Sequence, residues 1–405
     1  MSETGSIQRR RILLALGLAG GAWLAPSLTG HGLARASEGS GGGSGGASAP
    51  SRPAPPAPRP EVLLLTQGPV DIALREAGYF ILQSRQTSGG HLYRLRAPAG
   101  LSARRIEADL AQRFPGSLPA PNTLYRAGEF VCSGAECAAH AAVSWPPQAT
   151  GKGLRIGMID TGINPEHEAL RGSKLRLLRA DPGERPAAGR RHGTAIAALL
   201  IGQRGSPAPG LLPEAELVAV DAFHRLGSGE AADAYTLSEA VDLLIDEGVS
   251  VLNLSFEGAE NPILHRALRR AAEHGIALVA AAGNGGAGAA PAYPAAWPEV
   301  VAVTATDVRG RAWRQANQGA YIRFAAPGVR LWTAASVSGG RLKSGTSFAA
   351  PFVTAALALR IDTDPAKTLE QHLSDLEHCA EDLGVPGRDD VFGAGLISME
   401  LQCLA

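Results

Sequence analysis

Short apolar runs alternate with helical segments through the second half of the chain. Five runs are rich in Val, Ile, Leu and Ala and do not alternate with polar residues, which is typical of strands buried on both faces: 154–159, 216–220, 249–254, 276–281 and 300–303. Helical patterns lie between them at 193–201, 236–247 and 263–274. Strands that alternate with helices predict an α/β domain at 153–405, with a mostly parallel sheet and helices on both faces.

A different pattern precedes this domain. Residues 62–65 and 79–82 read as buried strands, and 91–95 alternates in strand fashion. A helix is expected from Ser102, because Ile106, Leu110 and Phe114 are spaced four apart and therefore share one face. We therefore predict a small α+β unit at 61–125 and a connector at 126–152.

The front of the chain has neither pattern. The segment 37–60 consists almost entirely of Gly, Ser, Ala and Pro, so it cannot form a core and is predicted to be a linker. Charge adds little, because the 38 basic residues equal the 38 acidic residues in number. This balance indicates neither a nucleic-acid partner nor a basic face for anionic lipid.

The first 36 residues have the features of an export signal. Three arginines at 9–11 precede an apolar stretch at 12–25, and Ala34-Arg35-Ala36 is a small-x-small cleavage site before Ser37. The apolar stretch is short for a membrane span, which needs about 20 residues. An uncleaved anchor is the alternative, and the residues after the arginines match a twin-arginine signal imperfectly.

Four cysteines form two local pairs, Cys132 with Cys137 and Cys379 with Cys403. In an exported chain an even number of cysteines favours disulfides. The alternative for the first pair is a zinc cluster with His140, but it would have only three of the usual four ligands.

Two residues at the start of the α/β domain are candidates for acid–base chemistry. Asp160 follows the run 154–159, where a carboxylate can accept a hydrogen bond from an imidazole, although an Asp at this place is also typical of metal or nucleotide sites. His192 begins the apolar helix 193–201, and the following Gly leaves little side chain around the ring. A single His is otherwise usually structural.

A nucleophile and an amide donor are found further along. Ser347 lies in Ser-Gly-Thr-Ser-Phe-Ala-Ala-Pro, where a helix is expected to begin, so that free N–H groups would hold an oxyanion; an ordinary N-cap is the alternative. Pro351 is expected in the first turn. Asn284 follows the run 276–281 and can donate to an oxyanion, or it is a turn residue. Ala349 replaces the second Gly of the Gly-x-Ser-x-Gly elbow, which argues against a lipase or esterase.

With these motifs in the order Asp, His, Asn, Ser, the chain from Gly153 onward resembles the subtilisin-like serine proteases. The separations suit the family, since 192 − 160 = 32 and 347 − 192 = 155, and the matching strings are Asp160-Thr161-Gly162, His192-Gly193-Thr194, Ala282-Gly283-Asn284 and Gly345-Thr346-Ser347. The resemblance implies a serine endopeptidase with an acyl-enzyme intermediate. It further implies Asp160, His192 and Ser347 as the triad and Asn284 in the oxyanion hole.

The resemblance also implies how substrate is bound. An extended peptide would add as a strand along Ser255 and Phe256, and Ala281, Ala282 and Ala292 would line the main pocket. This apolar lining predicts a hydrophobic residue before the scissile bond. Two departures stand near the site, Phe348 in place of the usual Met and Glu257 in place of a common Gly, which adds charge or narrows the cleft.

The unit at 61–125 occupies the place of the family's propeptide, which chaperones folding and blocks the cleft; a substrate-recruiting or envelope-binding module is the alternative. We expect polypeptide substrates, a monomer and no cofactor, since no Asp-rich loop matches the family's calcium sites. The expected location is the periplasm, the cell envelope or the extracellular space. A catalytically silent relative that binds peptides is the competing hypothesis, although all four active-site side chains are present.

Overall fold

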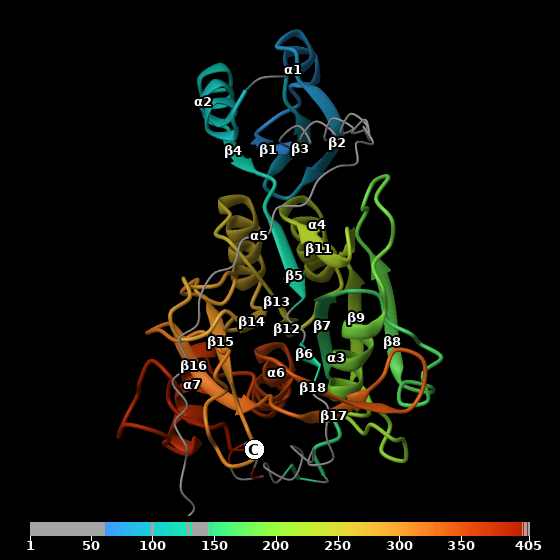
Figure 1. Ribbon diagram of the computed structural model, residues 1–405, viewed down its shortest axis with the longest axis vertical. Helices are drawn as coiled ribbons and strands as arrows, with labels where there is room; N and C mark the ends of the chain where they lie inside the picture. Colours follow the sequence, from blue (N-terminus) through green and yellow to red (C-terminus); the bar gives the residue numbers. More distant parts are fainter. Residues whose placement is uncertain are drawn as a thin grey trace, which may run out of the picture. The chain divides into compact units, whose positions relative to one another are not determined.

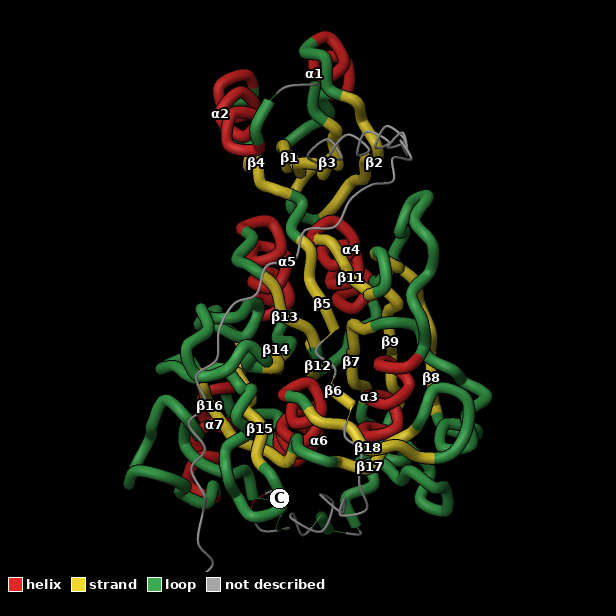
Figure 2. Tube along the Cα trace, in the orientation of Figure 1, coloured by secondary structure: helices red, strands yellow, loops and turns green. Residues whose placement is uncertain are grey.

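The structure is a computed structural model that describes residues 61–98, 101–127, 130–131, 145–146, 148–398, 400 and 403 (Figures 1 and 2). The predicted export signal at 1–36 and the linker at 37–60 lie outside the described residues. So do Cys132, Cys137 and His140, whose pairing therefore stays a prediction.

A seven-stranded sheet forms the centre of the larger region, and all its neighbouring strands are parallel. Its strand order is β16-β15-β14-β12-β7-β9-β8. In chain order the strands are β7 (Arg155–Asp160), β8 (Lys174–Arg179), β9 (Glu216–Asp221), β12 (Val251–Leu254), β14 (Ala277–Ala281), β15 (Val300–Thr306) and β16 (Ile322–Pro327). The four central strands β7, β9, β12 and β14 match predicted apolar runs, and so does β15.

Helices cover both faces of this sheet, which confirms the predicted α/β fold. One core cluster joins the sheet to α3 (Arg191–Ile201) and α6 (Thr346–Thr363), and the other joins it to α4 (Ala234–Asp246) and α5 (Pro262–Glu273). The Asp233 carboxylate caps α4 by accepting from the Thr236 N–H at 3.0 Å. Three of these helices match the helical patterns expected from the sequence.

Pro351 was expected in the first turn of its helix, but it is the sixth residue of α6 and lies in the helix interior. A proline there has no N–H to donate to the carbonyl four residues earlier, which belongs to Ser347. The Ser255 hydroxyl supplies the missing donor, at 2.9 Å from the Ser347 carbonyl oxygen. The substitute donor comes from a strand end 92 residues away.

The N-terminal region folds as a four-stranded antiparallel sheet with two helices (Figure 2). Its elements are β1 (Glu61–Thr66), α1 (Asp71–Glu76), β2 (Phe80–Thr87), β3 (Gly90–Arg96), α2 (Ala103–Arg113) and β4 (Leu118–Pro121). Leu64, Leu74, Ile106 and Leu110 share its core. The segment at 79–82 was expected to be buried, but Phe80 is 59% exposed because β2 is an edge strand.

Beyond β4 the chain enters the larger region as strands. In Figure 1 β5 (Leu124–Ala127) extends from β4 toward β6 (Phe130–Val131). β5 pairs with β11 (Gly229–Asp233) on one side and with β13 (Phe256–Gly258) on the other, while β10 (His224–Leu226) completes that sheet. β6 pairs with β18 (Gly340–Ser344), which also pairs with β17 (Leu331–Ala334). β5 therefore crosses the boundary expected at residue 125.

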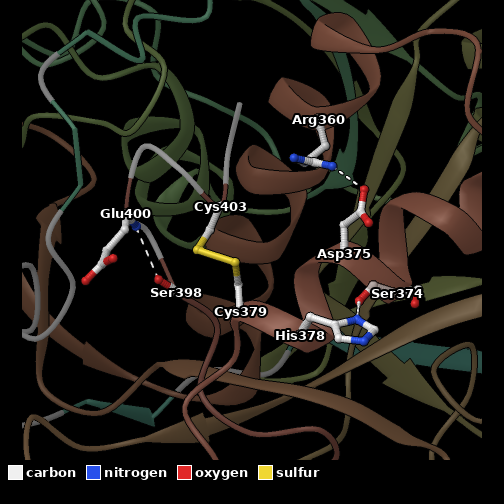
Figure 3. Close-up of a disulfide and its surroundings, with 8 residues drawn as sticks. All are labelled: Arg360, Ser374, Asp375, His378, Cys379, Ser398, Glu400 and Cys403. Carbon is white, nitrogen blue, oxygen red and sulfur yellow. Dashed lines mark hydrogen bonds and ion pairs between the residues drawn. A yellow bond between two sulfur atoms is a disulfide. The ribbon is translucent and has the colours of Figure 1, made fainter.

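One disulfide lies near the carboxyl end of the chain. Cys379, the last residue of α7 (Leu369–Cys379), is bonded to Cys403 (Figure 3). This confirms the pairing suggested by their positions in the sequence. In the part of the chain that the structure describes, no helix is both long enough and apolar enough to cross a membrane.

Candidate active site

The proposed acid–base pair lies at the carboxyl end of the parallel sheet. Asp160 is the last residue of β7, and His192 is the second residue of α3. The His192 Nδ1 lies 2.7 Å from one carboxylate oxygen of Asp160 and 2.9 Å from the other. His192 is completely buried and Asp160 is 1% exposed, so this contact is shielded from water.

The residues that follow Asp160 and His192 in the sequence, Thr161 and Gly193, hold the two segments together. A Cβ at Gly193 would stand 2.3 Å from the Thr161 carbonyl oxygen, so a side chain there would separate α3 from the end of β7. The Gly193 N–H donates to the Thr161 hydroxyl at 2.9 Å. The Thr161 N–H in turn donates to the Asp160 carboxylate at 2.7 Å. These contacts hold the ring and the carboxylate in register.

The proposed nucleophile Ser347 is the second residue of α6 and is completely buried. Its hydroxyl donates to the Ser255 carbonyl oxygen at 3.1 Å. The next residue, Phe348, packs against the His192 ring with the ring centres 5.4 Å apart. The Phe that replaces the family's usual Met therefore contacts the imidazole directly and adds an aromatic wall beside it.

The side-chain amide of Asn284 is oriented but unpartnered. Its oxygen accepts from both the N–H and the hydroxyl of Thr346, each at 3.0 Å, so the amide can present only its NH₂ group elsewhere. That Nδ2 atom is buried and has no hydrogen-bond partner among the described residues. A buried donor without a partner is costly, and an oxyanion would satisfy it.

Thr346 was not predicted as a site residue. The signal available in the sequence was a hydroxyl side chain immediately before Ser347, but nothing local indicates that it contacts Asn284, which lies 62 residues earlier. A second buried chain of polar contacts was also missed. In it the Thr354 hydroxyl donates to the side-chain oxygen of Asn253, and the side-chain NH₂ of Asn253 donates to the Ser255 hydroxyl.

The alanines expected to line a pocket lie near Asn284. Ala281 ends β14, and Ala282 accepts a hydrogen bond from the Tyr321 hydroxyl through its carbonyl, at 2.9 Å. The Ala292 methyl lies only 2.8 Å from where a Cβ on Gly283 would stand, so these two segments are in close contact. All three alanines are buried, at 2%, 0% and 7% exposure.

Glu257 adds a carboxyl group to this region. Its Oε2 accepts from the Asn284 N–H at 2.7 Å and so joins β13 to the segment that carries the proposed oxyanion donor. Burial raises the pKa of the Glu257 carboxyl, and the backbone and side chain of Asn284 act in the opposite direction.

The cleft between β11 and β13 holds β5. Tyr125 of β5 is completely buried, makes an edge contact with Phe256 at 5.7 Å, and donates its hydroxyl to the Ala259 carbonyl at 2.9 Å. A Cβ at Gly258 would lie 2.4 Å from the Tyr125 ring, so the absence of a side chain there creates this space. The predicted substrate segment at Ser255 and Phe256 is thus adjacent to a strand of the same chain.

No group of three or more His, Cys, Asp or Glu side chains that could hold a metal ion is found among the residues that the structure describes. The expectation from the sequence that the protein needs no cofactor and has no calcium site of the family's type stays a prediction.

The fold and this site together define a subtilisin-like α/β protein. The model of the subtilase family matches residues 151–395, and the chain belongs to this family. The chain is 34% identical over 261 residues to the Minor extracellular protease Epr of Bacillus subtilis (strain 168), covering 64% of this chain and 40% of that protein. It is 32% identical over 254 residues to Subtilisin Savinase of Lederbergia lenta, covering 62% and 91%.

Solved structures are similar in fold. Fervidolysin from Fervidobacterium pennivorans, a keratinolytic enzyme related to subtilisin, has a TM-score of 0.72 at 20% identity, covering 85% of this chain and 60% of that one. The protease domain of PatA has a TM-score of 0.56 at 24% identity, covering 64% and 96%. The chain thus matches less than half of the Epr protein but nearly all of the smaller relatives.

Proposed function

We propose that this protein is an exported serine endopeptidase that is synthesised as a zymogen. The observation that carries the proposal is β5, which lies as an added strand between β11 and β13 beside Ser347. A cleft that pairs with an extended backbone on both sides suits a polypeptide substrate. A lipase or esterase has no need of it.

The proposed chemistry uses the contacts at the site. His192 takes the proton of the Ser347 hydroxyl as its oxygen attacks the peptide carbonyl, and then gives that proton to the leaving amine. Asp160, hydrogen-bonded to Nδ1, fixes the tautomer of the ring and stabilises its protonated form. The free amide of Asn284 and the Ser347 N–H hold the oxyanion. Water then hydrolyses the acyl-enzyme.

The main pocket is proposed to accept a hydrophobic residue before the scissile bond. The support is that Ala281, Ala282 and Ala292 are all buried and lie near Asn284. The test is to map the products from a protein digest by mass spectrometry. Cleavage mainly after Arg, Lys or Asp would contradict this preference.

The N-terminal region is proposed to inhibit the enzyme until the chain cuts itself between Ala127 and Phe130. β5 ends at one of these residues and β6 begins at the other, and β6 pairs with Ser344 close to the nucleophile. The complete burial of His192 and Ser347 also fits a closed, uncut state. Export is proposed from residues 1–36, and the similar Epr protein is by its name extracellular.

The decisive experiment compares the chain from Glu61 onward with its Ser347→Ala variant, by intact mass against time and by digestion of casein. We expect the parent to cut itself between Ala127 and Phe130 and to digest casein, and the variant to do neither. The matched control is Ser338→Ala, which makes the same change at an exposed serine and should behave like the parent. If parent and variant both stay intact and inert, the chain is instead a silent peptide binder.

A further inference from the structure

Glu257 is a half-buried carboxyl residue of β13, the strand that pairs with β5 in the cleft. Its carboxyl is partly withdrawn from water, and among the described residues no basic side chain forms an ion pair with it. Its Oε2 accepts a hydrogen bond from the Asn284 N–H, and its polar neighbour is the uncharged Asn284, which supplies no positive charge. A partly buried carboxylate without a countercharge is unfavourable, so a cationic group brought by a ligand would stabilise it.

The pairing of β5 indicates which substrate residue meets Glu257. In the antiparallel register, Ala127 lies opposite Phe256, Arg126 opposite Glu257, and Tyr125 opposite Gly258. The Ser347 hydroxyl contacts the Ser255 carbonyl, so the residue aligned with Ser255 precedes the bond that is attacked. Counting back from that bond, the second residue aligns with Phe256, the third with Glu257 and the fourth with Gly258.

Side chains directly opposite each other in an antiparallel pair lie on the same face, with Cβ atoms about 4.5–5.5 Å apart. The third substrate residue therefore stands on the face of the strand pair that carries Glu257. Tyr125 stands at the fourth position, and Phe256 is the enzyme residue opposite the second position. Both positions lie on the other face of the strand pair, where the two rings are in contact. In this chain the residue opposite Glu257 is an arginine.

We propose that Glu257 makes the enzyme selective for lysine or arginine at the third residue before the scissile bond. This inference rests on the proposed function. The chain's own residues 125–127, with the sequence Tyr-Arg-Ala, serve as the template for the fourth, third and second residues before the bond. Recognition is by a charge-assisted pair between the basic side chain and the carboxylate, so an acidic third residue is rejected by repulsion.

The test uses quenched fluorescent peptides of the form Tyr-X-Ala-Leu-Glu-Phe-Val, with X as Arg, Gln or Glu and with Leu before the scissile bond to suit the proposed hydrophobic pocket. The enzyme is the full chain after self-processing. For the parent we expect kcat/KM with Arg to exceed that with Glu by about tenfold or more. In Glu257→Gln, which keeps an oxygen acceptor for the Asn284 N–H, the ratio should fall to near one. In Glu257→Arg it should invert.

Glu260→Gln is the matched control, because it removes an exposed carboxylate three residues away and should leave the ratio unchanged. Ratios within one enzyme do not depend on its active fraction, so a partly folded variant is still informative. An active Glu257→Gln enzyme that keeps the parental ratio overturns the proposal.

Failure of the proposed function has a different signature. In that case neither the peptides nor casein are cut by any form of the chain, whatever residue stands at X. A chain that digests casein but is indifferent to X keeps the proposed function and loses only the role of Glu257.

Discussion

The two sheets of this protein bury their faces in different ways. The seven-stranded parallel sheet has helices of its own region on both faces, with α3 and α6 on one and α4 and α5 on the other. The four-stranded antiparallel sheet covers one face with α1 and α2. Its other face, with Leu63, Leu65 and Leu92, belongs to the same core cluster as α4 and α5.

The N-terminal region therefore depends on the larger region to bury one face of its sheet. Leu63 and Leu64 are neighbours in β1 and both are completely buried, but they lie in different clusters. Leu64 stays buried in any folded N-terminal region, whereas Leu63 is buried only while that region is docked. The last strand of the N-terminal region, β4, contacts α5 and is followed directly by β5. The chain therefore connects the surface that docks onto the larger region with the strand that lies in the cleft.

The largest expected effect concerns the larger region alone. Asn284→Ala should lower turnover of a peptide by about 10²–10³, a magnitude known for this residue type in subtilisin and carried over by analogy. Thermal stability should fall as well, because the change also removes the oxygen that accepts from the N–H and the hydroxyl of buried Thr346, so turnover is compared at a temperature where the variant is folded. Asn317→Ala is the contrasting control, because the Asn317 side chain bonds Gly285 and Ala290 and should mainly affect stability. Full turnover in Asn284→Ala would contradict the assignment.

The next effect separates the two faces of the smaller sheet. Leu63→Ala and Leu64→Ala should each cost about 2–5 kcal/mol, but at different places. In the uncut Ser347→Ala background, hydrogen exchange should accelerate in α4 and α5 for Leu63→Ala, and in α1 and α2 for Leu64→Ala. Identical exchange patterns in the two variants would show that the two faces are not independent.

A smaller, pH-dependent effect is expected at His224, next to the N-terminal sheet. Burial lowers the pKa of His224 to about 4, and the charges of Arg185 and Arg94 act in the same direction, against Glu61. The folded form thus binds fewer protons than the unfolded form, and stability falls as pH drops from about 6.5 toward 4. After the cut, the N-terminal region should dissociate several-fold faster at pH 5 than at pH 7.

Activity recovered against time at each pH measures this release. His224→Gln should remove most of the pH dependence, while His378→Gln in α7, distant in sequence and outside the shared core, should retain it. A His224→Gln enzyme with the parental pH dependence would assign the effect to other groups.

The smallest effect is expected at the rim between the two regions. Arg85 of β2 pairs with Asp242 of α4 at 2.9 Å, with side chains 17% and 19% exposed. Pairs near the surface contribute about 0.2–1 kcal/mol, so Arg85→Ala should accelerate release by less than about fivefold. Added salt should reduce the difference between parent and variant, and a salt-independent difference would indicate lost packing on Tyr235 instead.

Much of the larger region followed from the sequence because its signals are local. Strands buried on both faces require continuous apolar runs, and the runs at 154–159 and 249–254 correspond to β7 and β12. The candidate residues were found in the same way, since a nucleophile at a helix start and an amide at a strand end each need small neighbours within a few positions. Edge strands were harder, as Phe80 shows, because an exposed apolar side chain cannot be recognised from its own segment.

The order of strands and helices and the proposed site residues could therefore be predicted from local patterns in the sequence. How these residues are oriented and covered depends on packing between distant segments. Thr346 turns the Asn284 amide, Ser255 replaces the donor lost at Pro351, and Glu257 reaches Asn284 from another strand. Such contacts join residues far apart in the chain. A local pattern records what each segment prefers to form, but the partner that satisfies a buried polar group is chosen only when the segments pack.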